Sequence, residues 1–170
     1  MSARMRIGVA GAGQIGRRHS ELIAAPPDCV LSGIADPSPA AKDYAESLGV
    51  RWYADHRALL EQDKPDGLII ASPNNLHLPM ALDCAAAGVP ALIEKPVTDT
   101  VANAQRLCAA ARTSGADAYL IDTERQVRAE WLEGARVVGI SSGASAPEEL
   151  VTRLVDFFRA RGTEDVAEFE

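Results

Sequence analysis

The stretch Arg6-Ile7-Gly8-Val9-Ala10-Gly11-Ala12-Gly13-Gln14-Ile15-Gly16 decides the fold of this 170-residue chain. Its first five residues form an apolar run that predicts a buried strand, and residues 14–24 have the pattern of a helix. The three glycines between strand and helix allow a tight turn, a close approach of the backbone to a pyrophosphate, and close packing of the helix on the strand. We therefore expect a phosphate-binding turn, with the N-terminus of the helix facing the ligand. The alternative is a glycine turn that binds nothing.

A carboxylate stands where a dinucleotide site of this kind needs one. Asp36 follows Gly16 by twenty residues, at the end of the second expected strand. At that place a carboxylate accepts hydrogen bonds from the adenosine ribose hydroxyls. Its charge repels a 2′-phosphate, and Pro37 follows it in place of an arginine, so NAD is favoured and NADP is the alternative. Arg17 and Arg18 weaken that preference slightly.

Strand-like and helical patterns alternate along the whole chain. Because each parallel crossover needs a connection of helix length, this alternation predicts one α/β domain over residues 1–170, with a single doubly wound, mostly parallel sheet and helices on both faces. The expected strands are 6–10, 29–35, 51–53, 67–71, 91–93, 119–121 and 136–140. The expected helices are 14–24, 39–48, 56–62, 76–87, 101–113, 129–133 and 147–161.

Composition excludes several classes of protein. A hydrophobic fraction of 47% excludes a disordered chain, and a net charge of −7 argues against binding to nucleic acid. No apolar run reaches the roughly 18–20 residues of a membrane span, and the first residues lack the apolar core of a signal peptide. Cys29, Cys84 and Cys108 are too few and too far apart for a disulfide framework or a zinc ribbon. We expect a cytoplasmic protein without a metal site, and both a monomer and a small homo-oligomer remain open.

A second group of polar residues follows the fourth and fifth expected strands. Ser72-Pro73-Asn74-Asn75-Leu76-His77 comes after the fourth, and Glu94-Lys95-Pro96 comes after the fifth. Because ligands bind beyond the carboxyl ends of parallel strands, these residues and the glycine turn should meet in one cleft. Lys95 would donate to a substrate hydroxyl or to the nicotinamide ribose. The alternatives are a His77 that only begins a helix and a Lys95 that is a solvated surface residue.

These motifs make residues 5–115 resemble the N-terminal half of the Gfo/Idh/MocA oxidoreductases, which have a Rossmann-like fold. Glu94-Lys95-Pro96 is the most specific of them, and Ala35-Asp36-Pro37 also fits. That family transfers hydride to or from C–OH groups of sugars, inositols and related compounds. The resemblance implies that Lys95 is the catalytic-site lysine. It implies a cofactor site for NAD made of Gly11, Gly13, Gln14, Ile15, Gly16, Asp36, Ser72, Asn74, His77, Glu94 and Lys95.

The resemblance ends near Gly115. Members of that family continue into a large C-terminal domain that carries the substrate pocket and a catalytic histidine. Only 55 residues follow Gly115 here, and none of them is a histidine. The general acid–base partner for hydride transfer is therefore missing from the 170 residues.

Residues 116–170 resemble the last part of the LytB family, the iron–sulfur hydroxymethylbutenyl diphosphate reductases. The matching stretches are Ala118-Tyr119-Leu120-Ile121-Asp122, Glu130-Trp131-Leu132-Glu133-Gly134 and Val138-Gly139-Ile140-Ser141-Ser142-Gly143-Ala144-Ser145-Ala146-Pro147-Glu148. The resemblance and the nearby helix start suggest an anion site at Ser141, Ser142 and Ser145. The alternative is that Ser145 only caps its helix. No iron–sulfur cluster is expected, because no cysteine lies in this stretch.

Two segments of unrelated families predict a fold chimera joined between residues 98 and 118, engineered or arising from a natural gene fusion. We expect residues 1–115 to be a dinucleotide-binding fragment and residues 116–170 an αβ fragment that completes its sheet. Such a chain would retain an NAD site without turnover. The alternatives are a truncated or fused oxidoreductase that needs another chain for its substrate, and a folding scaffold that binds no ligand. The residues expected to pack the second fragment onto the first are Trp131, Leu150, Leu154, Phe157 and Phe158.

Overall fold

The computed structural model describes residues 4–143 and 146–167. Over these residues the chain forms a five-stranded sheet in which all neighbouring strands are parallel and the spatial order is β3-β2-β1-β4-β5. Chain order reverses at β1, with β2 on one side of it and β4 on the other, and such a reversal opens a crevice at the carboxyl ends of the strands. The strands are β1 (Met5–Ala10), β2 (Cys29–Ala35), β3 (Arg51–Tyr53), β4 (Gly67–Ile70) and β5 (Ala91–Ile93).

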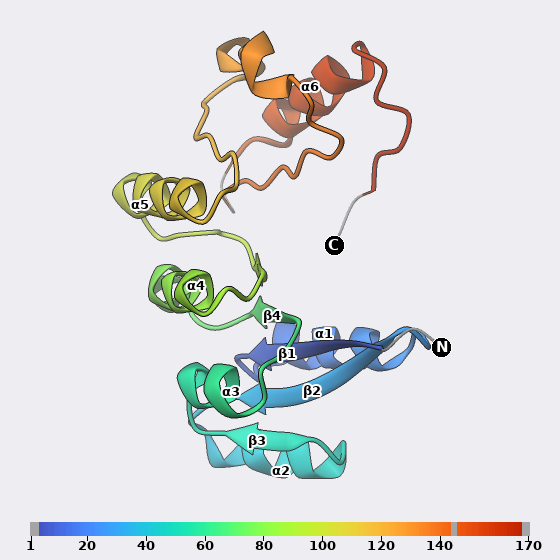
Figure 1. The fold of residues 1–170 in the computed structure, drawn as a ribbon, viewed down its shortest axis with the longest axis vertical. Coiled ribbons are helices and arrows are strands. Elements are labelled where there is room, and N and C mark those ends of the chain that lie inside the picture. The colour runs from blue at the N-terminus through green and yellow to red at the C-terminus, as the bar shows by residue number, and fades with distance from the viewer. Residues whose placement is uncertain (1–3, 144–145, 168–170) are drawn as a thin grey trace.

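Helices cover both faces of this sheet (Figure 1). α1 and α2 pack on one face and α3 and α4 on the other, while α5 lies alongside α4. The predicted doubly wound α/β fold is therefore confirmed. The helices are α1 (Gln14–Ala24), α2 (Pro39–Ser47), α3 (His56–Gln62), α4 (Asn74–Ala87), α5 (Val101–Thr113) and α6 (Glu148–Arg159), with the 3-10 helices η1 (Glu124–Gln126) and η2 (Ala129–Leu132). None of them is long and apolar enough to cross a membrane, within the residues that the structure describes.

The hydrophobic core has two halves, one on each side of β1. Val9 contributes to the half under α1 and α2, and Ala10 to the half under α3 and α4, because successive strand residues face opposite ways. Gly8 leaves room in the second half, since a Cβ at this position would lie 2.9 Å from side-chain atoms of both Leu59 and Leu68. Both leucines are almost wholly buried as a result.

The last part of the chain departs from what the sequence predicts. Residues 119–121 and 136–140 are not strands, and residues 129–132 form the short η2 instead of an α-helix. α5 precedes residues 119–121 and is long enough for a crossover, but among the described residues the chain beyond it does not pair with β5, and η1 and η2 are too short for a second crossover. Within the described residues the sheet therefore ends at β5, and the expectation that the last residues complete it was wrong.

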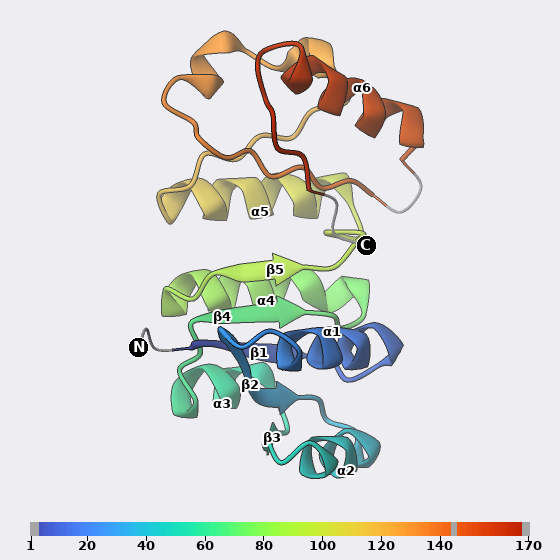
Figure 2. The same cartoon turned by 90° about the vertical axis from the view of Figure 1, so that its right-hand side faces the viewer.

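The expected packing of these residues on the sheet was also wrong. η1, η2 and α6 lie beyond α5, on the side away from the sheet (Figures 1 and 2). The ring of Trp131 stacks on that of Tyr119 with centroids 3.8 Å apart, and α6 contacts η1. Leu150, Leu154, Phe157 and Phe158 are half-buried within this outer layer, and no residue of α6 is fully buried.

A single leucine should contribute more to stability in the core of the sheet domain than in the outer layer beyond α5. Leu59→Ala empties space in the core and should lower the free energy of unfolding by about 2–5 kcal/mol. Leu120→Ala removes a side chain that is 48% exposed and should change it by about 0.5 kcal/mol or less. Urea unfolding followed by far-UV circular dichroism measures both. Equal losses would contradict a core confined to the sheet and the helices that cover it.

Candidate functional site

The glycine turn between β1 and α1 brings strand and helix into close contact. A Cβ on Gly16 would lie 1.8 Å from the carbonyl oxygen of Gly11, so α1 can sit this near to β1 only with glycine there. Gly11 has a φ of +98° and lies against the backbone of Ala71, where a Cβ would be 2.6 Å from the carbonyl oxygen. Both positions therefore require glycine for reasons of packing and backbone conformation.

Gly13 differs from the other two glycines. It is the residue that precedes α1, it has extended backbone, and no side chain caps the helix there. A Cβ built on Gly13 would meet no protein atom within 4 Å. The open space lies at a helix N-terminus, where unpaired N–H groups and the helix dipole favour an anion. This geometry fits the pyrophosphate of a dinucleotide.

Asp36, just beyond β2, is joined to this turn. Its Oδ2 accepts a hydrogen bond of 2.8 Å from the N–H of Ala12, and its Oδ1 accepts one of 2.8 Å from the N–H of Ser38. Burial raises the pKa of the Asp36 carboxyl, but these hydrogen bonds and the positive charge of Arg17 lower it by more, so the pKa lies below its ordinary 3.8. The carboxylate is ionised at neutral pH and retains lone pairs for ribose hydroxyls.

Arg17 is held close to α1 and α2. Its Nε donates to the carbonyl oxygen of Ala12 at 3.1 Å, and its guanidinium lies 4.5 Å from the centre of the Tyr44 ring. The Tyr44 hydroxyl donates back to the carbonyl oxygen of Arg17 at 3.3 Å. The guanidinium is therefore already engaged by backbone and ring, while the neighbouring Arg18 is exposed and pairs with Glu21 at 3.5 Å.

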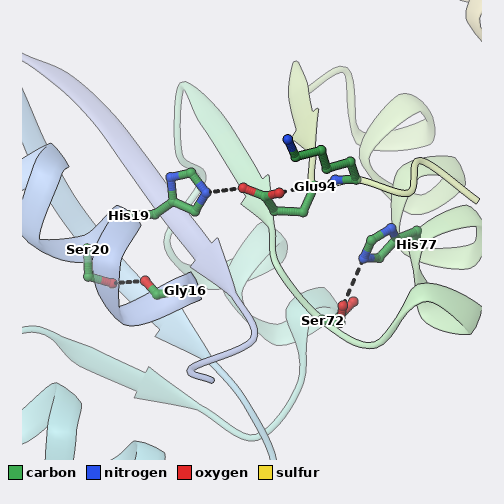
Figure 3. A network of polar contacts seen from close by, with 7 residues as sticks. Gly16, His19, Ser20, Ser72, His77 and Glu94 are labelled. Carbon is green, nitrogen blue, oxygen red and sulfur yellow. Dashed lines mark hydrogen bonds and ion pairs between the residues drawn. The ribbon is translucent and has the colours of Figure 1, made fainter. Parts of the chain in front are cut away.

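The residues that follow β4 and β5 meet α1 at the carboxyl ends of the strands (Figure 3). Ser72 lies in the loop between β4 and α4, and its buried hydroxyl has no hydrogen-bond partner among the described residues. Asn74 is the exposed first residue of α4. The Lys95 ammonium makes no ion pair within the part of the chain that the structure describes. The exposed side chains of Asn74 and Lys95 are thus accessible to a ligand at this edge of the sheet, whereas the Ser72 hydroxyl is buried.

His77 makes contacts only inside the protein. It is 1% exposed, with Nε2 2.8 Å from the carbonyl oxygen of Ser72 and Nδ1 3.0 Å from that of Pro96. The structure thus places this predicted cofactor ligand between two loops, and not at the surface of the cleft. A direct contact of His77 with NAD stays a prediction.

Sequence reasoning missed His19, a site residue of α1. Its Nε2 lies 2.5 Å from Oε1 of Glu94, which joins α1 to the loop after β5 (Figure 3). His19 follows Gly16 by three residues and therefore lies on the same face of α1, toward the sheet. The three-residue spacing from Gly16 could have indicated that His19 faces the sheet. Its partner Glu94, however, lies 75 residues further along the chain.

The predicted anion site lies in the outer layer, apart from this cleft. Ser141 is exposed and Ser142 half-buried, and α6 begins after Pro147 without a side-chain cap. The proposed roles of Ser145, as a cap or an anion ligand, lie outside the described residues. An anion site at these serines stays a prediction.

The cysteines do not fit an iron–sulfur cluster. Cys29 begins β2, Cys84 is buried in α4 and Cys108 lies in α5. Burial and the nearby charge of Asp83 raise the pKa of the Cys84 thiol to about 11, so it is a poor thiolate ligand. Nowhere in residues 4–143 and 146–167 do three His, Cys, Asp or Glu side chains gather to hold a metal ion.

The family described as "Oxidoreductase family, NAD-binding Rossmann fold" (GFO_IDH_MocA) matches residues 5–121. The chain belongs to this oxidoreductase family. Residues 98–159 also match the family of the LytB protein, so the two matches share residues 98–121. Both resemblances found in the sequence are thus confirmed.

Individual proteins agree with both matches. The rhizopine catabolism protein MocA of Rhizobium meliloti is 33% identical over 103 residues, which cover 61% of this chain and 32% of that protein. The 4-hydroxy-3-methylbut-2-enyl diphosphate reductase of Ralstonia nicotianae is 52% identical over 64 residues, which cover 38% of this chain and 20% of the reductase. The chain therefore spans a third or less of the length of these relatives.

Solved dehydrogenases share the fold. The structure of GenD2 from gentamicin A biosynthesis, in complex with NAD, superposes with a TM-score of 0.63 and 31% identity. The match covers 68% of this chain and 34% of GenD2. The arrangement of strands and helices around the cleft is therefore that of an NAD-binding oxidoreductase domain.

Gly16 and Gly13 should respond differently to alanine. Gly16→Ala forces α1 away from β1 and should lower the free energy of unfolding by about 3 kcal/mol or more. Gly13→Ala meets open space and should change it by about 1 kcal/mol or less. Urea midpoints at constant m-value measure the difference. A tolerated Gly16→Ala would show that the close approach of helix and strand is not needed.

Proposed function

We propose that the chain binds NAD across the carboxyl ends of β1, β2 and β4. The observation that carries this proposal is the open face of Gly13 at the N-terminus of α1, with the ionised Asp36 held beside it. The pyrophosphate would lie over the glycine turn, and the adenosine ribose would donate its hydroxyls to Asp36. The nicotinamide end would reach Ser72, Asn74 and Lys95. Bound NAD would supply the hydride acceptor in this cleft.

Charge favours NAD over NADP. The 2′-phosphate of NADP would meet the carboxylate of Asp36, whose lone pairs the ribose hydroxyls of NAD satisfy. The guanidinium of Arg17 keeps its positive charge beside the Ala12 carbonyl and the Tyr44 ring, so it offsets only part of this repulsion. The preference for NAD therefore rests on the ionised Asp36, which two backbone N–H groups hold in place.

We further propose that these 170 residues do not turn over substrate by themselves. A general acid–base histidine must be free to approach the substrate. The three histidines of the chain are His19, His56 and His77. They are engaged with Glu94, with Asp83 and with two backbone carbonyls, respectively. In this proposal the chain is a chimera of two family segments, joined in the region that both matches share.

A second candidate is a dehydrogenase unit completed by another chain. It is favoured by Lys95, which is exposed beyond β5 and whose ammonium makes no ion pair within the described residues, so that it could meet the nicotinamide end of a bound NAD. The other chain would supply the substrate pocket and the acid–base group.

Cofactor titration tests the proposed binding. Calorimetry should give saturable binding of NADH and weaker binding of NADPH. Asp36→Ala should weaken NADH binding by about tenfold or more, because two ribose hydrogen bonds to a charged acceptor are lost. Gly13→Ala should also weaken it while the protein stays folded, because the methyl group enters the space for the pyrophosphate. No saturable binding by the wild type at millimolar cofactor would overturn the proposal.

Turnover tests whether the 170 residues act alone. The isolated chain incubated with NAD and a panel of polyols and inositols should produce no NADH above the background of a Lys95→Ala control. NADH formation that depends on Lys95 would overturn the proposal that these residues do not turn over substrate by themselves.

A further inference from the structure

The segment Glu94-Lys95-Pro96 leaves the sheet at its edge. β5 has three residues and pairs with β4 alone among the described strands. The N–H of Glu94 still donates to the carbonyl oxygen of Ile70, at 2.9 Å, and the ladder ends there. A lysine placed beyond so short an edge strand needs further contacts if its ammonium is to stay at the cleft.

His19 supplies such a contact from α1. The imidazole and the Glu94 carboxylate are largely shielded from solvent, with side chains 16% and 23% exposed. Oε1 of Glu94 meets His19, and Oε2 accepts a hydrogen bond of 3.1 Å from the backbone N–H of Lys95. One carboxylate therefore joins helix α1 to the backbone of the lysine.

His77 holds the other end of the same segment. Its Nε2 lies near the carbonyl oxygen of Ser72 (Figure 3) and its Nδ1 near that of Pro96, so the ring connects the loop after β4 with the loop after β5. The segment is thus fixed on both sides of Lys95, by side chains from α1 and from α4.

We propose that His19 is a positioning residue, which acts through Glu94 to hold Lys95 at the nicotinamide end of the cleft. This inference rests on the proposed binding of NAD. Gly13 directly precedes α1 and Gly16 lies within it, so the helix that would receive the pyrophosphate is linked by one side-chain contact to the loop that bears Lys95. Loss of the contact would release the Lys95 loop and leave the adenosine half of the site intact.

Comparison of two ligands tests this role. ADP-ribose fills the adenosine and pyrophosphate subsites, whereas NADH also reaches the Lys95 loop. His19→Ala should weaken NADH binding by about tenfold, the size of one charge-assisted hydrogen bond, and change ADP-ribose binding by less than about twofold. His19→Gln, whose amide nitrogen can occupy the place of Nε2, should restore NADH binding. Calorimetry measures all four affinities.

His56→Ala is the matched control. His56 is also shielded and also pairs with a carboxylate, with Nε2 2.7 Å from Oδ2 of Asp83, but this pair joins α3 to α4 away from the glycine turn. Its loss should leave the ratio of NADH to ADP-ribose affinity unchanged. If the loss of a histidine acted only on the stability of the fold, His19→Ala and His56→Ala would change the ratio of NADH to ADP-ribose affinity in the same way.

Amide hydrogen exchange gives a readout that needs no ligand. The Lys95 amide should exchange faster in His19→Ala than in His56→Ala, because Glu94 is no longer held as its acceptor. An unchanged rate, or an equal loss of NADH and ADP-ribose binding, would overturn the positioning role. If the wild type binds neither ligand, the proposed function fails together with the inference that rests on it. Binding of both ligands with no selective loss in His19→Ala refutes the positioning role alone.

Discussion

At the crossing of β1 and α1 the carbonyl oxygen of Gly11 fills the place that a Cβ of residue 16 would need, only 1.8 Å away. That contact sets how near the first helix lies to the central strand. From this position α1 directs its N-terminus at the open face of Gly13, and its next turn brings His19 to the loop after β5. The positions of the glycine turn and of the contact between His19 and Glu94 therefore both depend on the absence of a side chain at Gly16.

The cleft is also organised before any ligand arrives. Asp36 is fixed by two backbone N–H groups, Arg17 by a carbonyl oxygen and a tyrosine ring, and the Glu94 loop by His19. Groups that are already ordered lose little conformational entropy on binding. The helix N-terminus adds a preference for an anion that does not depend on any titrating side chain. Binding of a dinucleotide, as proposed, would therefore require little further ordering of these side chains.

The sequence predicts the first half of the molecule well because its signals there are local. The apolar run before Gly11, the glycine spacing and the stop at Gly88 each depend on a few neighbouring residues, and the structure has the expected strands and helices around them. The runs at 119–121 and 136–140 have similar composition, but a strand forms only where the chain also reaches a partner strand, and neither run pairs with the open edge of β5. The contact between His19 and Glu94 could not be predicted from local sequence either, since only the folded chain brings the two residues together. The contacts of His77 were also not predictable, since its ring meets the carbonyl oxygens of two different loops that come together only in the folded chain.

The open side of β5 exposes unpaired backbone groups, and Leu92 on this strand is 47% exposed. Edges of this kind recruit strands from other molecules and lead to aggregation. Here the strand is three residues long and runs directly into an acidic residue, a basic residue and a proline that has no N–H to donate. The tripeptide Glu94-Lys95-Pro96 therefore ends the edge strand after three residues and leaves little length on which a strand of another molecule could pair.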